Sequence, residues 1–269
     1  MAIGLFKKLL SLFKIKKQKK IGLALGSGGV KGLAHIGALR AFEEEGIYFD
    51  LVAGSSIGSI VGAMYALGYS SASMLEYIKQ LRLDDPFTLI KMKIQGLTPE
   101  KLLEQVFGGK LIEELNLPFC AVAVDLNSGE QVDLKSGCIA KSVLASSAIP
   151  PLLKPVEIAD NRLIDGAFRN AVPADVLKNM GADIVVGISL SNEITTNEQI
   201  KRTLDELYKD NNVPVCNRLA GSKSADFLLT PNLTAYKSTS INKMDEIYEI
   251  GYECAKRAMP AIKKILKIK

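Results

Sequence analysis

The feature that most constrains the fold is a strand–glycine–helix pattern that occurs twice within the first seventy residues. In the first unit, an apolar run at 21–25 leads through a glycine-rich segment at 26–32 into a helical pattern at 33–45. In the second, a short apolar run at 51–53 leads through a tight turn into a helical pattern at 57–67. Consecutive units of this kind place their strands side by side and parallel, joined by right-handed crossovers. The sequence therefore predicts an α/β fold with a mainly parallel central sheet.

The rest of the chain continues to alternate helical patterns with apolar strands. Further helices are expected at 71–82, 99–107, 138–147, 173–180 and 245–267, the last interrupted at Pro260. Strands are expected as two hairpins, 118–125 with 130–134 and 156–158 with 162–164, and as a single strand at 183–190. Residues 191–223 are polar and mixed, and they are expected to form an excursion from the fold. No internal repeat is visible, so residues 21–269 are expected to form one domain behind an arm, residues 1–20.

Composition narrows the chemistry before any motif is considered. The 269 residues are 48% hydrophobic, which is enough to bury a continuous core without disulfides or structural metal. The four cysteines stand at 120, 138, 216 and 254 without C-x-x-C spacing, and His35 is the single histidine. A zinc site of the usual Cys/His type therefore lacks ligands, and we expect no metal. The thiols are expected to be reduced, as they are in the cytosol.

The positive charge of the chain is concentrated at its N-terminus. The formal net charge is +5, yet seven of the 34 Lys and Arg residues lie in residues 1–20, which contain no acidic residue. The rest of the chain therefore has 27 basic and 29 acidic residues. Nucleic-acid binding, which requires basic residues spread over a folded face, is therefore not expected. A helix over 3–13 would carry apolar side chains on one side and lysines on the other. Such an arm fits an anionic membrane surface, or it docks on the body of the protein, and both interpretations stay open.

Residues 51–75 contain no charged side chain, and the stretch resembles a membrane-spanning dimerisation helix because its glycines at 54, 58 and 62 are spaced four apart. Against this, the stretch also holds six serines, and the mixture is too weakly apolar for a convincing span. A short buried strand, a tight turn and a closely packed helix explain the same residues better. We therefore expect no membrane span in this stretch.

The turn after the second strand, Gly54–Gly58, fits the pattern G-x-S-x-G. In this pattern, glycines relieve crowding at a strained strand-to-helix turn, and the central residue, here Ser56, projects as a nucleophile. An acyl-transfer nucleophile also requires donors for the oxyanion that develops during the reaction. Gly28 and Gly29 can supply such donors, because two backbone N–H groups without side chains can converge on one point.

Phosphate binding is the competing interpretation of residues 26–32. A Rossmann fingerprint that begins at Gly26 would require glycine where Lys31 stands, and one that begins a residue later would require glycine in place of Ser27. A Walker loop would require Ser or Thr after Lys31, where Gly32 stands. The segment is therefore not a clean nucleotide-binding fingerprint.

The general base has three candidates. Asp165 ends the strand 162–164 and precedes Gly166, so its carboxylate is expected at the edge of the sheet. Asp125 ends another strand, and the ordinary role of both residues would be to form turns. His35 lies about one turn into a helix among apolar neighbours, which indicates a packed or capping residue. Asp165 is the stronger candidate, and partial burial in an apolar pocket would raise the pKa of its carboxyl toward that of a useful base.

Several segments in order along the chain resemble the patatin-like phospholipases. They are Leu23–Gly37, Gly54–Gly58, Ala145–Pro150 and Asp165–Ala167, and the likeness extends through roughly residues 21–190. The resemblance implies a three-layer α/β/α sandwich that hydrolyses acyl esters of lipids with a serine–aspartate dyad, without metal or cofactor. It implies these site residues: Ser56 as nucleophile, Asp165 as general base, and Ser27, Gly28, Gly29 and Val30 as the oxyanion-binding loop.

The chain departs from the pattern of this family at three positions. Ser27 stands where glycine is usual, Lys31 where arginine is commoner, and Val124 where a threonine often precedes the aspartate. The backbone N–H of a serine can still donate, and we expect Gly28 and Gly29 to bind the oxyanion. The histidine of the loop helix is not catalytic in this family, which agrees with the interpretation of His35.

Together these features favour a cytoplasmic serine acyl hydrolase, peripheral on the inner face of the membrane, that cleaves phospholipids or other acyl lipids. One alternative is a catalytically silent module that binds membranes or regulates a partner through the same fold and arm. A second alternative is a nucleotide-binding enzyme.

Deletion of residues 1–20 should weaken binding to anionic vesicles by at least about tenfold, because each lysine near an anionic surface contributes about 1 kcal/mol. Hydrolysis of a soluble ester should be spared. Vesicle sedimentation of the full chain and the shortened chain measures the effect, with vesicles of neutral lipid as the control. Equal binding of the two chains to anionic vesicles would contradict a membrane role for the arm.

Overall fold

The structure, a computed structural model, describes residues 19–81, 97–190, 197–208, 212–213 and 217–268. Almost all of the expected N-terminal arm lies outside these ranges, so its helical character stays a prediction. Parts of the expected excursion after the strand at 183–190 also lie outside them.

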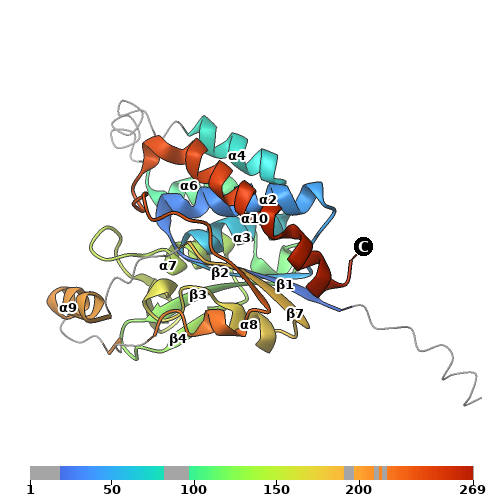
Figure 1. The fold of residues 1–269 in the computed structure, drawn as a ribbon. Coiled ribbons are helices and arrows are strands. Elements are labelled where there is room, and N and C mark those ends of the chain that lie inside the picture. The colour runs from blue at the N-terminus through green and yellow to red at the C-terminus, as the bar shows by residue number, and fades with distance from the viewer. Residues whose placement is uncertain (1–18, 82–96, 191–196, 209–211, 214–216, 269) are drawn as a thin grey trace, which may run out of the picture.

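A mixed sheet forms the centre of the molecule (Figure 1). Its strands are β1 (Ile21–Leu25), β2 (Leu51–Ser55), β3 (Phe119–Asp125), β4 (Gln131–Leu134), β5 (Val156–Ile158), β6 (Asn161–Asp165), β7 (Ile184–Ile188) and β8 (Phe227–Leu229). The order is β5–β6–β3–β2–β1–β7–β8, and β4 pairs with β3 beside this path. The strands from β3 to β8 in this order are parallel, whereas β4, β5 and β6 join by antiparallel pairing. The mainly parallel sheet and both expected hairpins are confirmed.

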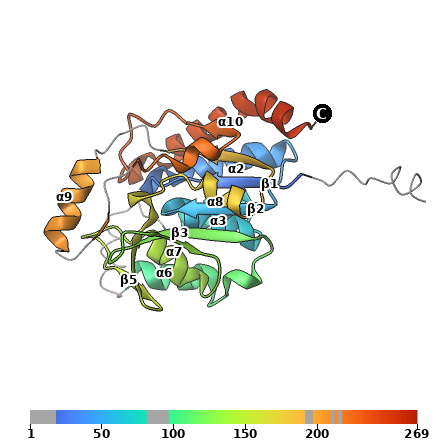
Figure 2. The same ribbon diagram turned by 90° about the horizontal axis from the view of Figure 1, so that it is seen from below.

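Helices cover both faces of the sheet (Figures 1 and 2). One face carries α2 (Leu33–Glu44), α3 (Ile57–Leu67), α4 (Ser71–Gln80), α6 (Pro99–Phe107), α7 (Ile139–Ser146) and α10 (Met244–Leu266). The other face carries α8 (Ala174–Asn179). A further helix, α9 (Asn197–Leu207), lies beyond the sheet, where Leu204 packs with Val124 and Ile164. The described residues therefore form the expected α/β/α sandwich.

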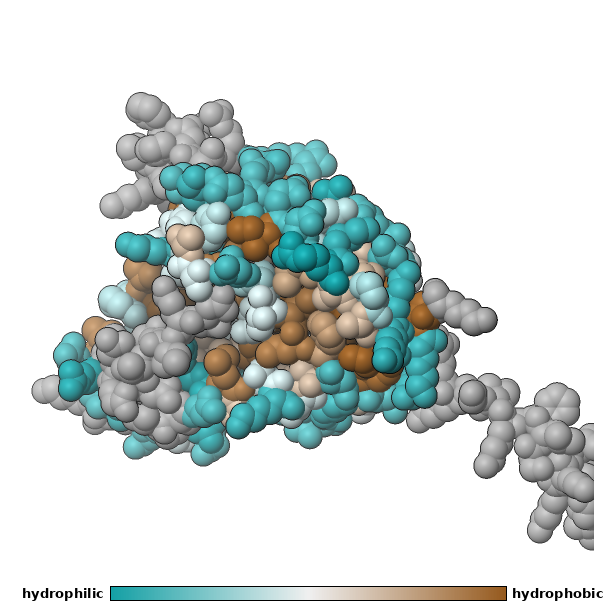
Figure 3. Space-filling view, in the orientation of Figure 1, coloured by the Kyte–Doolittle hydropathy of each residue, from teal (hydrophilic) through white to brown (hydrophobic). Residues whose placement is uncertain are grey.

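The core follows from the alternation of side chains along the strands. Leu23 and Leu25 of β1 point into the cluster shared with α2, α3 and α10, whereas Ala24 between them points into the cluster around α8. Both faces of the central strands are buried, as is typical of parallel sheets between helices. Figure 3 shows hydrophobic residues gathered near the middle of one face of the molecule, with hydrophilic residues around them.

The C-terminal helix corrects one expectation. α10 runs without interruption through Pro260, which was expected to break it. Tertiary packing on both sides of the proline explains why, because Met259 and Ile262 are buried and Lys263 pairs with Glu45 at the end of α2. Earlier in α10, the two helices also cross at points that accommodate no side chain. A Cβ atom at Gly37 would overlap the carbonyl oxygen of Tyr248, and one at Gly251 would overlap the carbonyl of Ala34. This tertiary packing outweighs the loss of one hydrogen-bond donor at the proline.

Residues 51–75 form β2, a turn, α3 and the start of α4 rather than one helix. Across the described part of the chain, no helix combines the length and the apolar character that crossing a membrane requires.

Candidate active site

The glycine-rich loop, Ser56 and Asp165 come together at one edge of the sheet. β1 and β2 are parallel and end side by side, so the loop after β1 lies next to the turn after β2. Ser55 of β2 pairs with Val122 of β3, and the next residue of β3, Ala123, pairs with Asp165 of β6. Ser56 and Asp165 therefore lie at one level on either side of β3, about 10 Å apart between strand axes. Two side chains on the same face can close such a gap.

The turn at Ser56 is strained. Its φ of 55° and ψ of −128° are unusual for a residue other than glycine. The glycines around it allow the chain to fold back sharply. A Cβ atom at Gly54 would overlap the carbonyl of Gly58, and one at Gly58 would overlap the carbonyl of Leu25. The turn thus presents Ser56 directly before α3, where the positive end of the helix dipole favours developing negative charge.

Asp165 is buried to 99% beside this serine. Its Oδ1 accepts the Ala167 N–H at 2.7 Å, whereas Oδ2 makes no well-formed hydrogen bond among the described residues. Burial raises the pKa of the Asp165 carboxyl to about 6; hydrogen bonding from the Ser56 side chain and the Ala167 amide and the charge of Arg218 oppose the rise only in part. The contact with Ser56 is therefore a loose one, of the kind that tightens when substrate binds.

The four backbone N–H groups of residues 27–30 differ in whether they have a hydrogen-bond acceptor among the described residues. The N–H of Ser27 donates to the Ala171 carbonyl at 2.9 Å, and the N–H of Val30 donates to the Ser238 carbonyl at 2.9 Å. These two bonds fix both ends of the loop. The amides of Gly28 and Gly29, between them, donate to no carbonyl or side chain in the described part of the chain. Both residues also line the pocket that contains Ser56 and Asp165.

His35 hydrogen-bonds to the backbone at the start of the glycine-rich loop and does not line the pocket. The ring is completely buried, and Nε2 lies 2.7 Å from the carbonyl oxygen of Gly26, so Nε2 carries the hydrogen and donates. Burial lowers the pKa of His35 to about 4, because the hydrogen bond to Gly26 offsets the loss of hydration only partly. The imidazole is therefore neutral and already engaged at neutral pH, as expected of a packed residue.

Asp125, the rival carboxylate, forms a turn. It accepts hydrogen bonds from the backbone N–H groups of Asn127, Ser128 and Arg162. Burial opposes ionisation, but these hydrogen bonds prevail and lower the pKa of the Asp125 carboxyl. It is not among the residues that line the pocket around Ser56.

A pocket of about 410 Å³ contains Ser56, Asp165, Gly28 and Gly29 together. Of the other predicted loop residues, Ser27 also lines this pocket, whereas Val30 is not among its lining residues. The walls that were not predicted as site residues are Lys31, Ile149, Leu152, Ala167, Phe168, Leu190, Arg218, Ser238 and Thr239. Ile149 and Ala167 lie within the motifs at 145–150 and 165–167, and Phe168 follows the second one directly, which is a weak signal that could have found them. Arg218 and Ser238 come from distant segments, and no sequence pattern connects them to the site.

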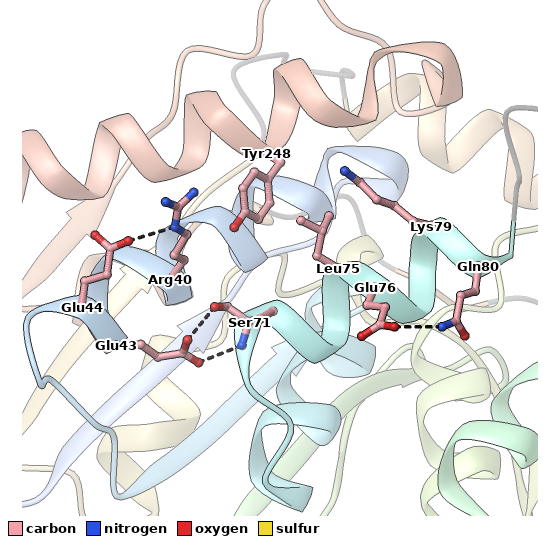
Figure 4. Close-up of a pocket in the computed structure, with 10 residues that line it drawn as sticks. Arg40, Glu43, Glu44, Ser71, Leu75, Glu76, Lys79, Gln80 and Tyr248 are labelled. Atoms are coloured by element: carbon pink, nitrogen blue, oxygen red, sulfur yellow. Dashed lines mark hydrogen bonds and ion pairs between the residues drawn. The ribbon is translucent and has the colours of Figure 1, made fainter.

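A larger groove, about 850 Å³, lies between α2, α4 and α10 (Figure 4). Several of its polar side chains are paired with one another. The Nε of Arg40 donates to Glu44 at 2.9 Å, and the hydroxyl of Ser71 donates to Glu43 at 2.5 Å. None of the predicted site residues lines this groove. Within the described residues, no group of three or more His, Cys, Asp or Glu side chains could hold a metal ion.

The substitution Asp165→Asn should stabilise the protein relative to the wild type at pH 8 by about 3 kcal/mol, and much less at pH 4. The folded-state pKa of Asp165, about 6, lies above its ordinary value of 3.8, so ionisation opposes folding. The stability present below pH 3.8 is therefore lost as the pH rises through 6. Urea unfolding at both pH values measures the difference.

Asp125→Asn is the matched control for this substitution. Because the pKa of Asp125 is lowered in the folded state, its ionised form stabilises the fold, and Asn should cost more at pH 8 than at low pH. A difference between the wild type and Asp165→Asn that is the same at pH 4 and pH 8 would contradict the raised pKa.

Comparisons with known proteins extend the resemblance seen in the sequence. The model of the family described as "Patatin-like phospholipase" matches residues 23–178, which is more than half of the chain. The patatin-like phospholipase domain-containing protein 6 of Mus musculus is 29% identical over an alignment of 285 positions, gaps included, that covers 91% of this chain and 21% of that protein. An uncharacterised NTE family protein of Mycobacterium bovis is 36% identical over 181 residues, covering 64% of this chain and 49% of that protein.

The chain thus spans about a fifth of the length of the mammalian relative and about half that of the mycobacterial one. Among solved structures, human GIVD cytosolic phospholipase A2 is similar in fold, with a TM-score of 0.52 and 11% sequence identity. The likeness covers 98% of this chain and 62% of that one. From the family match over residues 23–178, the chain belongs to the patatin-like phospholipase family.

Proposed function

We propose that this protein is a serine acyl hydrolase that cleaves ester bonds of phospholipids or other acyl lipids. The observation that carries the proposal is that Ser56, Asp165, Gly28 and Gly29 line one and the same pocket. Nucleophile, base and oxyanion donors are the three parts that acyl transfer requires. Membership of the patatin-like phospholipase family supports lipid esters as the substrate class.

In the proposed reaction, the Ser56 hydroxyl oxygen attacks the acyl carbonyl carbon while its proton passes to the Asp165 carboxylate. The carbonyl oxygen becomes an oxyanion that accepts the N–H groups of Gly28 and Gly29. Collapse of the tetrahedral intermediate breaks the ester bond, and Asp165 returns the proton to the departing alkoxide. Water then attacks the acyl-enzyme, with Asp165 again as the base, and releases the fatty acid and free Ser56.

The raised pKa of Asp165 supports its role as the base. A carboxylate with an ordinary pKa near 4 is too weak a base to accept a proton from serine efficiently. With a pKa of about 6, Asp165 is still ionised at neutral pH yet accepts a proton more readily. The neutral, buried ring of His35 is engaged with Gly26 and does not line the pocket, so the proposal is a dyad rather than a triad.

The walls of the pocket suit an acyl chain. Phe168 and Leu190 line its interior, and Ile149 and Leu152 line it from an exposed segment. Leu152 is 81% exposed and Ile149 40%, which leaves apolar surface in contact with water. Apolar surface beside a pocket for lipid esters is expected to enter the acyl region of a membrane.

Basic residues accompany this apolar surface. Lys154 follows Leu152 in the same segment, and Lys237 precedes two residues of the pocket wall, Ser238 and Thr239; both lysines are exposed. Lysines beside exposed apolar side chains favour anionic lipid surfaces. The proposal thus includes a membrane surface as the place of action, with the arm, residues 1–20, as a second contact.

Ser56→Ala and Asp165→Asn should each lower ester hydrolysis by at least about a thousandfold, because each removes a group that takes part in covalent or proton-transfer chemistry. Initial rates on a panel of lipids and short esters, together with labelling by a fluorophosphonate, measure the effect. Ser55→Ala and Asp125→Asn are the matched controls and should hydrolyse and label as the wild type does.

His35→Ala should retain measurable hydrolysis if its fold is intact. If the His35→Ala protein were folded but inactive, the mechanism would have to be a triad that includes His35 rather than a dyad. A wild type that neither hydrolyses any ester nor forms an adduct at Ser56 would favour the silent membrane-binding module instead.

Leu152→Asp should lower hydrolysis of lipid in anionic vesicles about tenfold or more, because the apolar contact is lost and a like charge is added near the membrane. Hydrolysis of a soluble short ester should change less than twofold. Leu228→Asp, at another exposed leucine that does not line the pocket, is the control. Equal loss on both substrates would tell against a membrane contact at Leu152.

A further inference from the structure

The hydroxyl of Ser146 interrupts the ladder between β2 and β3 just where Ser56 leaves it. In this parallel ladder, Val52 N–H donates to the carbonyl of Pro118 at 3.0 Å. Donors recur at every second residue, so the regular pattern would bring the N–H of Ser56 to the carbonyl of Val122. Instead, Ser56 N–H donates to Ser146 Oγ at 3.0 Å, and Ser146 Oγ–H donates to the Val122 carbonyl at 2.6 Å.

A serine is chemically suited to this position. A hydroxyl carries one hydrogen and two lone pairs, so it can accept from one backbone group and donate to another at the same time. Ser146 is completely buried at the end of α7, and both hydrogen bonds are therefore shielded from water. The inserted hydroxyl keeps both backbone groups satisfied while separating Ser56 from β3. This separation allows the chain to adopt the positive φ of the turn at Ser56.

Residues 146–148 also hydrogen-bond to the backbone of Asp165. Two residues after Ser146, the carbonyl of Ala148 accepts the backbone N–H of Asp165 at 3.0 Å. The residue after the aspartate, Gly166, packs so closely on the Val122 carbonyl that a Cβ atom there would overlap it. Residues 146–148 thus bind the backbone amides of both proposed catalytic residues, and Val122 is a shared contact of the two sides.

We propose that Ser146 is a positioning residue that fixes the distance between the Ser56 hydroxyl and the Asp165 carboxylate. The proposal rests on the proposed function of these two residues, because it assigns Ser146 a role in their reaction. Ser146 itself is not among the residues that line the pocket. Its effect passes through the backbone of Ser56, whose loose contact with Asp165 leaves the geometry of the pair sensitive to small shifts.

The test compares Ser146→Ala with two matched variants of the same helix end. Ser147→Ala removes a neighbouring buried hydroxyl that has no hydrogen-bond partner in the described residues. Val143→Ala removes two methyl groups from the completely buried side of α7 and reports what loss of stability alone does. For each folded variant, kcat and KM on a short ester, the rate of fluorophosphonate labelling, and amide hydrogen exchange in residues 54–58 are measured.

Ser146→Ala should lower kcat and the labelling rate about ten- to a hundredfold at an unchanged KM, since a displacement of about 1 Å can cost a hundredfold in rate. Exchange in residues 54–58 should accelerate in this variant. Ser147→Ala should match the wild type, and Val143→Ala should keep its kcat within about threefold despite a lower melting temperature.

Unchanged exchange in residues 54–58 of Ser146→Ala would overturn the proposal, and so would a loss of kcat no greater than that of Val143→Ala. Failure of the proposed function has a different signature, namely a wild type that neither hydrolyses esters nor labels at Ser56. The catalytic role of Ser146 would fall with it, whereas normal labelling of both the wild type and Ser146→Ala would contradict the positioning role alone.

Discussion

The buried carboxylate of Asp165 is the constraint on which the candidate site depends. Among the described residues, one well-formed hydrogen bond, from the Ala167 amide, compensates for its loss of water, and burial raises its pKa to about 6. Ionising such a group opposes folding, so the rest of the fold must supply the stability that this residue withholds at neutral pH. The same burial that weakens the fold gives the carboxylate the basicity that the proposed reaction needs.

Burial of the hydrophobic clusters on both faces of the sheet stabilises the fold against this penalty, and close backbone contacts accompany that burial. Glycines at the crossing of α2 and α10, and within the turn around Ser56, allow the main chain to approach without side chains between. Such contacts leave little room for movement, and interiors packed this closely transmit small displacements. A strained turn can therefore persist at Ser56, because its surroundings determine its conformation more strongly than its own preference does.

The pocket is formed both by the local glycine-rich loop and by contacts from residues far away in the chain. The glycine loop is fixed at its ends by carbonyls of Ala171 and Ser238, and from behind by His35. The wall residues Arg218 and Ser238 arrive from the C-terminal part of the chain. A loop whose own sequence is rich in glycine has many conformations, and these long-range bonds select the one in which Gly28 and Gly29 line the pocket.

The sequence alone determined the strand–turn–helix units, because hydrophobic period and glycine placement act within a few residues of each other. It also singled out Ser56 and Asp165, since a nucleophile turn and a carboxylate at a strand end are local patterns. The uninterrupted path of α10 through Pro260 was decided by the tertiary structure, because packing on α2 outweighs local propensity. The tertiary structure also decided which of the four loop amides are hydrogen-bonded within the protein. It likewise decided that the Ser146 hydroxyl lies between β2 and β3. Hydrogen bonds between residues far apart in the chain depend on strand register, which no local pattern specifies.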